Sequence, residues 1–181
     1  MKRNLCRACC LMVLFLSAAW AVQSEGALPR TVLEFEMCYR QEGTTPEAAA
    51  KLFFDGIFAY MDRSTRAEGR KMLALAMDER PDWDGRVTMK LFADRMKSPK
   101  TAHIFRSYAR GAVPENGYAM DPDNYELVIE RSAEGHPKGL QLYLRSGGAD
   151  YPRVIYMKEV NGFWFIADGS TVKVEVRPPR K

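Results

Sequence analysis

The sequence predicts a single α+β domain in which about three N-terminal helices pack against a curled antiparallel sheet of five to six strands. Two features along the chain support this fold class. Up to Lys97 the apolar residues recur at helical spacing, whereas from Thr101 onward they alternate with a period of two. The connections between the predicted strands are too short to contain crossover helices, so successive strands form an antiparallel meander. Helices followed by strands in a chain of 181 residues fit one domain with its own core.

The N-terminus predicts an export signal. Three basic residues in the first seven positions precede an apolar run over residues 8–18, and the Ala-Trp-Ala of residues 19–21 fits the small-x-small cleavage rule. That run is about half the roughly 20 residues that a membrane-spanning helix needs. We therefore expect residues 1–21 to be a signal peptide cleaved after Ala21, with an uncleaved anchor as the alternative. Residues 22–44 are then a linker with a possible first strand, and residues 45–181 form the α+β domain.

The charge and the cysteine content of the chain change when residues 1–21 are removed. The formal charge falls from +4 to +1, because this segment holds three basic residues and no acidic ones. A general electrostatic attraction to nucleic acid or to an acidic membrane is therefore not expected. Of the four cysteines only Cys38 remains, so the domain has no internal disulfide and depends on its core for stability. No metal site and no cofactor are predicted.

The first predicted helix has the clearest sequence signals. Thr44 stands three residues before Glu47, as in a capping box, and Pro46 occupies the first turn. An apolar stripe at helical spacing follows, typical of a helix that faces a core. Its members are Ala50, Phe53, Phe54, Ile57, Phe58 and Met61.

Two further helices follow in the sequence. The second is predicted from Ser64 to about Glu79, and the third over residues 85–97 with Asp84 as its N-cap. Trp83, between two acidic residues, is interpreted as a side chain that covers a junction between helices rather than as part of a site.

The predicted strands alternate between apolar and polar residues. Residues 31–38 form the possible first strand, although a segment this short also fits a helix. The Asn161-Gly162 pair predicts a tight hairpin turn, because both residues tolerate positive φ. The strands from Thr101 onward are predicted over residues 101–109, 124–131, 139–145, 152–160, 163–168 and 171–176.

The stretch from Phe105 to Tyr118 concentrates charged, aromatic and turn-forming residues. If residues 101–109 form a strand, Arg106 shares a face with apolar neighbours, and a buried arginine needs a carboxylate or phosphate partner. An internal set of ion pairs is the favoured interpretation, in which Arg106, Arg110 or Arg153 pairs with Glu115 or Asp150. A binding patch for an anionic or polar ligand is the alternative. Its candidate residues are Arg106, Tyr108, Arg110, Glu115, Asn116, Tyr118, Asp150 and Arg153.

No catalytic residue is assigned. The sequence lacks a phosphate loop, a dinucleotide fingerprint, a nucleophile elbow and a His-Glu-x-x-His motif, and it contains only two histidines. An isomerase-like mechanism would need a carboxylate in an apolar pocket and a hydrogen-bond donor for the oxyanion. Asp55 with Tyr108 or Tyr156 is the candidate pair, but the apolar stripe of the first helix predicts that Asp55 points toward water.

Two resemblances extend these predictions. The element order is similar to the cone-shaped ketosteroid-isomerase-like (nuclear-transport-factor-two-like) layout, which implies a pocket between the helices and a concave sheet. Residues 106–111 (RSYARG), 114–118 (PENGY), 146–150 (SGGAD) and 176–179 (VRPP) together resemble a family of bacterial exported domains of unknown function. That match covers about residues 45–179, and it departs from the family pattern at Tyr151 and Val154, where a small polar residue and a proline are expected. The resemblance implies a bacterial, exported, single-domain protein and supplies no activity.

The expected function is therefore that of a periplasmic or secreted bacterial domain that binds an unknown protein or small molecule without catalysis. No nucleic-acid partner is expected, and no membrane association after signal cleavage. A small pocket enzyme of ketosteroid-isomerase type is the first alternative. An accessory protein of an envelope or secretion system is the second.

Overall fold

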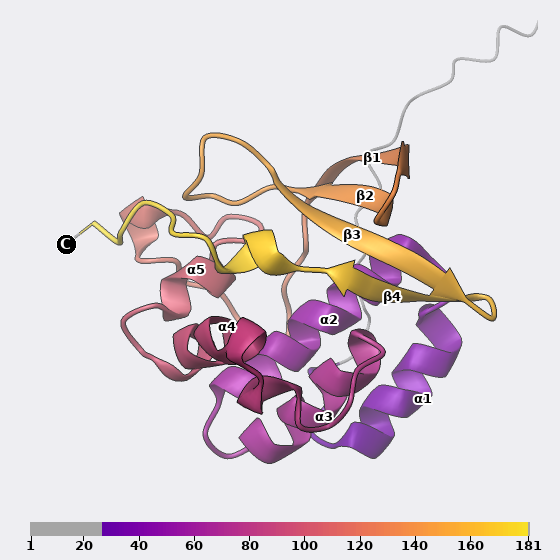
Figure 1. The fold of residues 1–181 in the computed structure, drawn as a ribbon. Coiled ribbons are helices and arrows are strands. Elements are labelled where there is room, and N and C mark those ends of the chain that lie inside the picture. Colours follow the sequence, from indigo (N-terminus) through magenta and orange to yellow (C-terminus); the bar gives the residue numbers. More distant parts are fainter. Residues whose placement is uncertain (1–26, 181) are drawn as a thin grey trace, which may run out of the picture.

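A computed structural model describes residues 27–180 of the chain, so the predicted signal peptide lies outside the described residues. Within this range, five α-helices precede a curled antiparallel sheet of four strands. Figure 1 shows the sheet, coloured orange to yellow, as one layer over the helices. The helices are α1 (Val32–Glu42), α2 (Pro46–Met61), α3 (Arg66–Ala76), α4 (Val87–Lys97) and α5 (Ala102–Arg106). The strands are β1 (Ile129–His136), β2 (Gly139–Leu144), β3 (Arg153–Val160) and β4 (Phe163–Asp168), and short 3-10 helices are η1 (Trp83–Gly85), η2 (Pro114–Asn116) and η3 (Ser170–Lys173).

Helix α2 lies at the centre of the fold. Every residue from Ala48 to Tyr60 is buried, and α1, α3, α4, α5 and β4 all contact this helix. A helix that is apolar around most of its circumference belongs in an interior, where neighbours cover it on all sides. Its N-cap is Thr45, whose hydroxyl accepts a hydrogen bond from the Ala48 N–H, and not Thr44 as the sequence pattern predicted.

Residues 31–38 were a possible first strand, with a short helix as the alternative, and the structure shows the helix, because this segment begins α1. Thr31 and Glu34 form a capping box: the Thr31 hydroxyl accepts from the Glu34 N–H, and the Glu34 carboxylate accepts from the Thr31 N–H. The buried residues of α1, Phe35 and Tyr39, are four positions apart, which is the spacing of one helix face. Over so short a segment, the apolar spacing of a helix resembles the alternation of a strand.

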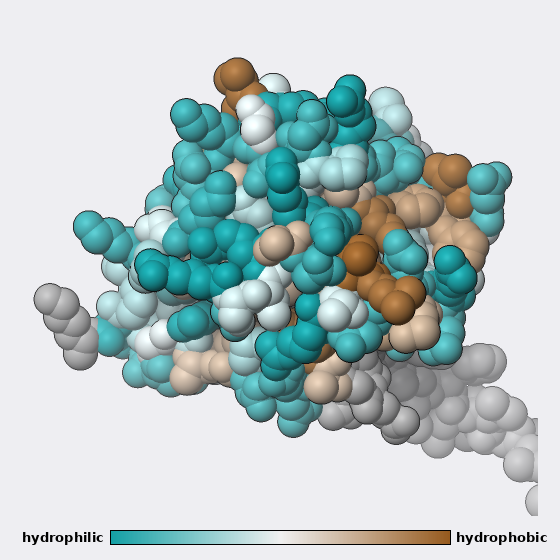
Figure 2. Space-filling model, turned by 90° about the horizontal axis from the view of Figure 1, so that it is seen from below, coloured by the Kyte–Doolittle hydropathy of each residue, from teal (hydrophilic) through white to brown (hydrophobic). Residues whose placement is uncertain are grey.

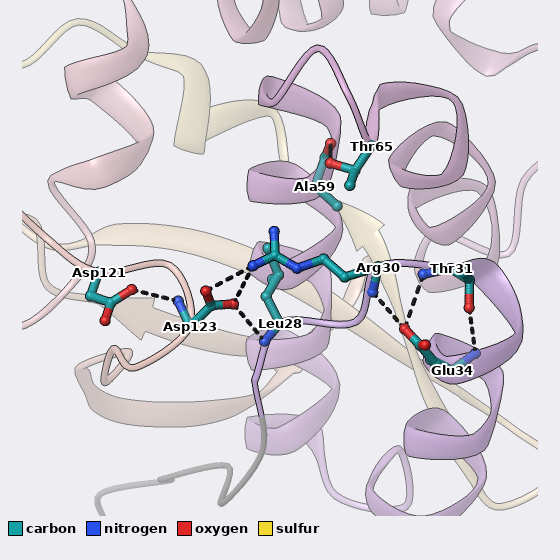
Figure 3. A network of polar contacts seen from close by, with 8 residues as sticks. All are labelled: Leu28, Arg30, Thr31, Glu34, Ala59, Thr65, Asp121 and Asp123. Atoms are coloured by element: carbon teal, nitrogen blue, oxygen red, sulfur yellow. Dashed lines mark hydrogen bonds and ion pairs between the residues drawn. The ribbon is translucent and has the colours of Figure 1, made fainter.

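The segment before α1 is held against a distant loop (Figure 3). The Asp123 carboxylate accepts hydrogen bonds from the Leu28 N–H at 3.1 Å and from the Arg30 guanidinium at 2.7 Å to both of its oxygens. Asp121 in turn accepts from the Asp123 N–H at 3.0 Å. Leu28 itself is buried, so the packed part of the chain begins at or before this residue.

The predicted strand over residues 101–109 is also absent. Residues 102–106 form α5, and the adjacent residues Ile104 and Phe105 are both buried, which one face of a strand would not allow. Phe105 packs edge-on against Phe92, and Tyr108 packs against Phe54. Helical spacing is therefore what brings these side chains into the core.

The sheet has four strands and not five to six, and the cone shape is not shown. The strand predicted over residues 124–131 begins only at Ile129, and residues 171–176 form η3 and an extended segment. The meander is confirmed, because the strands pair in sequence order and antiparallel. The Asn161-Gly162 hairpin is confirmed as well: both residues have positive φ, 53° and 82°, as a type I′ turn requires. The fully buried side chains of β2 and β3 are Leu142, Leu144, Ile155 and Met157.

Trp83 covers a junction between helices, as the sequence predicted. It is fully buried, its ring lies between those of Tyr60 on α2 and Phe92 on α4, and its Nε1–H donates to the Arg70 carbonyl at 2.9 Å. Three of the helices are therefore joined through one side chain.

The contact between α2 and α3 depends on Gly69. A Cβ atom at this position would lie 2.2 Å from the Tyr60 backbone nitrogen, too close for any side chain. We expect Gly69→Ala to destabilise the domain by about 1–3 kcal/mol in a urea unfolding experiment, although alanine favours helices more than glycine does. Gly85→Ala is the matched control, because no atom lies within 4 Å of the added Cβ. A Gly69→Ala variant as stable as the unsubstituted protein would contradict this account of the helix crossing.

Candidate functional site

A pocket of about 430 Å³ lies between the helices and the end of the sheet. This volume is within the range of about 300–1,000 Å³ that is usual for small-molecule sites. The pocket lies between the end of α3, the first half of α4, the end of β4 and η3, with α2 beneath it. In Figure 1 these elements meet at the front of the molecule, between α4 and β4. Its apolar lining consists of Phe53, Met77, Met89, Phe92, Ile166 and Ala167.

The floor of the pocket is rigid because it belongs to the core. Phe53 is fully buried and its ring stacks on that of Phe92, with 6.2 Å between the ring centres. Gly169 passes directly over Phe53, since a Cβ on this glycine would lie 3.2 Å from the Phe53 Cζ atom. Asp78 has a φ of 49°, and this left-handed conformation turns the chain away from α3 at the edge of the pocket.

The rim of the pocket carries five charged side chains, and each of the three carboxylates is paired with a cation. Asp78 pairs with Lys158 at 2.8 Å, Asp168 with Lys138 at 2.6 Å, and Glu79 with Arg86. The remaining member of the rim is Lys173 on η3. Among the residues that the structure describes, no carboxylate lies within ion-pair distance of the Lys173 ammonium group.

Asp168 is held in its ionised form. Partial burial by itself would raise the pKa of its carboxyl group, but hydrogen bonds from the Lys138 ammonium and the Ser170 N–H outweigh this effect and lower the pKa. The Ser170 N–H lies 2.8 Å from the carboxylate. This carboxylate is thus engaged by its own chain, and its pKa moves away from the neutral range in which a general base works best.

None of the eight residues proposed from the sequence lines this pocket. The expectation that Arg106 shares a face with buried apolar residues and pairs with a carboxylate is wrong: its side chain is exposed, and within residues 27–180 it forms no ion pair. It lies instead at another, smaller pocket of about 330 Å³, with Arg66 and Lys97. The cause is the change from a strand to the helix α5, which turns Arg106 away from the buried Ile104 and Phe105. Replacing Arg106 would therefore not leave a buried carboxylate unpaired.

Three of the four other predicted charges form ion pairs, but with different partners, and Arg153 makes a hydrogen bond to a backbone carbonyl. Arg110 pairs with Glu126 instead of with Glu115 or Asp150. Glu115 and Asp150 are paired with arginines of the C-terminal segment: Glu115 with Arg180 at 3.0 Å, and Asp150 with Arg177 at 3.8 Å. Arg153 donates to the Glu175 carbonyl at 3.2 Å. The sequence identified the charged residues, but it could not identify their partners. Two of these partners lie on the C-terminal segment, whose path is known only from the structure.

The three uncharged candidates also have structural contacts. The Asn116 side chain closes η2, accepting from the Val113 N–H at 3.1 Å and donating to the Gly111 carbonyl at 2.9 Å. Tyr118 is buried, and its hydroxyl donates to the Arg177 carbonyl at 2.5 Å. Tyr108 is fully buried, its hydroxyl has no hydrogen-bond partner among the described residues, and burial raises its pKa.

These contacts bring the four motif segments of the sequence together at one junction. The Gly147 N–H donates to the Ser107 carbonyl at 2.8 Å, and the Ser107 and Ser146 hydroxyls share a hydrogen bond of 2.8 Å. The Arg177 N–H donates to the Gly148 carbonyl at 2.9 Å. Residues 106–111, 114–118, 146–150 and 176–179 therefore hold the loops and the C-terminal segment in place.

The apolar stripe of α2 predicted that Asp55 points toward water, and this prediction is wrong. Asp55 lies in the interior with 3% of its surface exposed. Its carboxylate pairs with the Lys51 ammonium at 2.6 Å and accepts from the Tyr125 hydroxyl at 2.9 Å. Burial raises the pKa of Asp55, while Lys51 and Tyr125 act against that rise. The error arose because α2 is covered on its polar side as well, by the loop that carries Tyr125.

The sequence contained a signal for this buried cluster that the interpretation missed. Lys51 and Asp55 are four positions apart in an otherwise apolar helix, the spacing at which opposite charges meet. The hydroxyl that completes the cluster comes from Tyr125 and not from Tyr108 or Tyr156. Because Asp55 is held by both partners away from the pocket, it is not placed to act on a ligand there.

The structure also limits which other kinds of site the described part of the chain contains. Between residues 27 and 180, no three or more His, Cys, Asp or Glu side chains are grouped so that they could hold a metal ion. In the same part of the chain, no helix combines the length and the apolar character needed to cross a membrane.

The buried pair predicts a contrast between single and double substitutions. Asp55→Ala leaves the Lys51 ammonium buried without a counter-charge, so we expect a loss of about 3–5 kcal/mol in unfolding free energy. The double variant Lys51→Met/Asp55→Leu leaves no buried charge, and we expect it to be markedly more stable than Asp55→Ala. Glu130→Ala is the control, since its pair with Arg145 is partly exposed and is expected to contribute about 0–1 kcal/mol. A double variant as unstable as Asp55→Ala would show that the ion pair is not the cause.

Comparison with known proteins shows a family. A family model described as "Domain of unknown function (DUF6935)" matches residues 27–180, which confirms the resemblance seen in the four motif segments. No curated protein and no solved structure matches the chain, and the ketosteroid-isomerase-like layout is not confirmed. The match covers every helix and strand described above, from α1 to β4. The chain therefore belongs to the DUF6935 family of domains of unknown function.

Proposed function

We propose that the chain is an exported bacterial domain that binds a small ligand in the pocket between α4, β4 and η3, and that it does so without catalysis. The observation that carries the proposal is the pocket itself, which combines an aromatic and aliphatic floor with a charged rim. Clefts that are mostly apolar and have a few convergent polar groups are the usual form of small-molecule sites.

The state of the carboxylates favours binding over an isomerase-like reaction. Such a reaction needs a carboxylate that is free to take a proton from the substrate. The rim carboxylates Asp78, Glu79 and Asp168 are each paired with a cation, and Asp55 is held in the interior by Lys51 and Tyr125. Among residues 27–180, no carboxylate that lines the pocket is thus unpaired.

Export is supported by the composition of the N-terminus, where basic residues, an apolar run and Ala-Trp-Ala follow one another. We expect the protein expressed in a bacterial host to be recovered from the periplasm or the medium, with Val22 as its N-terminal residue by mass spectrometry. Cleavage at this point leaves Leu28 and its hydrogen bond to Asp123 intact. A full-length protein retained in the cytoplasm would contradict export, and a full-length protein in the membrane would support an uncleaved anchor.

The pocket is tested by closing it. Thr88 is an exposed lining residue on α4, and Thr88→Trp places a large ring at the mouth. We expect the unsubstituted protein to bind the neutral fluorescent probe N-phenyl-1-naphthylamine saturably, and we expect Thr88→Trp to weaken binding by about tenfold or more, which is about 1.4 kcal/mol.

Lys90→Trp on the same helix is the control, because Lys90 is exposed and does not line the pocket. We expect this variant to bind the probe as the unsubstituted protein does. Equal binding by the Thr88→Trp and unsubstituted proteins would show that the ligand site lies elsewhere.

A further inference from the structure

The charges around the pocket do not cancel. Its lining residues include three acidic ones, Asp78, Glu79 and Asp168, and two lysines, Lys158 and Lys173. Each carboxylate has its own cation, and those of Glu79 and Asp168 come from Arg86 and Lys138, outside the lining. Lys173 is thus the lining charge for which residues 27–180 provide no partner.

The position of Lys173 is fixed by the backbone that carries it. Val172, the preceding residue, is fully buried, and the Thr171 hydroxyl donates to the Val154 carbonyl of β3 at 2.6 Å. The Arg95 guanidinium of α4 donates to the Lys173 carbonyl and pairs with Glu175 at 3.2 Å. The base of the Lys173 side chain is therefore held on both sides, from the sheet and from α4, while its ammonium group remains available.

The floor of the pocket fits an apolar body. Phe92 stacks on the fully buried Phe53, and the methionines Met77 and Met89 have flexible side chains that adapt to ligands of different shape. An apolar floor beside one uncompensated cation matches a ligand with an apolar part and a negatively charged end.

The rim also limits the charge of that ligand. The carboxylates of Asp78, Glu79 and Asp168 are each paired already, so the Lys173 ammonium group is the one lining charge left to neutralise a ligand among the described residues. A group with more than one negative charge, such as a phosphate ester, would keep a charge without a partner in this pocket. A single carboxylate needs only one free ammonium group, with which it forms a charge-assisted hydrogen bond.

We propose that the pocket binds amphipathic monocarboxylates, with the apolar body on the Phe53–Phe92 floor and the carboxylate on the Lys173 ammonium group. This inference rests on the proposed function, because it names the class of ligand that the same pocket takes. Lys173 selects the head group of the ligand. The apolar floor binds the tail in the same way whatever the charge of the head group.

The test compares ligands that share a tail and differ in the head group. Octanoate, 1-octanol and octylammonium are titrated into the purified protein by isothermal titration calorimetry. We expect octanoate to bind about tenfold more tightly than 1-octanol, because a hydrogen bond between charged groups at a partly exposed site contributes on this scale. We expect octylammonium to bind more weakly than 1-octanol.

The variant Lys173→Met removes the charge and keeps an unbranched side chain of similar length. We expect it to lower the affinity for octanoate to that for 1-octanol, while the affinity for 1-octanol stays the same. Lys100→Met is the control, because Lys100 is exposed and does not line the pocket. Unchanged melting temperatures of both variants show that any effect on binding does not come from unfolding.

The outcomes separate this inference from the proposed function. If 1-octanol binds as tightly as octanoate, or if Lys173→Met keeps the preference for octanoate, the head-group assignment is overturned while the pocket remains a binding site. If none of the three ligands binds and the neutral fluorescent probe does not bind either, both the inference and the proposed function are overturned.

Discussion

Helix α2 is buried from Ala48 to Tyr60, and the remaining structure is arranged to cover it. A helix without an exposed face cannot be stabilised by one neighbour, so helices must approach it from several sides and β4 must close another. One of these approaches is at Gly69 of α3, where no side chain fits against the α2 backbone. The order of the elements in space thus follows from the burial of this one helix.

The burial of α2 also explains the polar cluster within it. Lys51 and Asp55 lie in a helix whose whole surface is covered, so their charges have to be satisfied inside the protein. They satisfy each other across one helical turn, and Tyr125 contributes both its hydroxyl and the face of its ring, with the Lys51 ammonium 4.0 Å from the ring centre. This arrangement fixes the loop that carries Tyr125 over α2. The same loop holds Asp123, which anchors Leu28 and Arg30.

The pocket lies where the two layers of the domain do not meet completely. Phe53 and Phe92 pack as core residues beneath the pocket, and η3 and the end of α3 lie at its margin. The motif-rich junction around residues 106–118, 146–150 and 176–179 does not line this pocket. Its glycines allow the close approach of backbones, since a Cβ on Gly147 would lie 2.1 Å from the Ala112 carbonyl oxygen. Much of the junction's sequence pattern is accounted for by this packing, while the residues of the pocket have no motif of their own.

The sequence by itself determined the features that depend on local chemistry. The α+β class, the meander, the start of the central helix near Pro46 and the Asn161-Gly162 turn all follow from periodicity and turn residues within short segments. Tertiary structure decided the rest. Residues 31–38 and 101–109 have too few residues to distinguish a helix from a strand, and packing against α2 selected the helix. The direction of Asp55 depended on the loop that covers it, and the pocket unites residues from Phe53 to Lys173, which only the folded chain brings together.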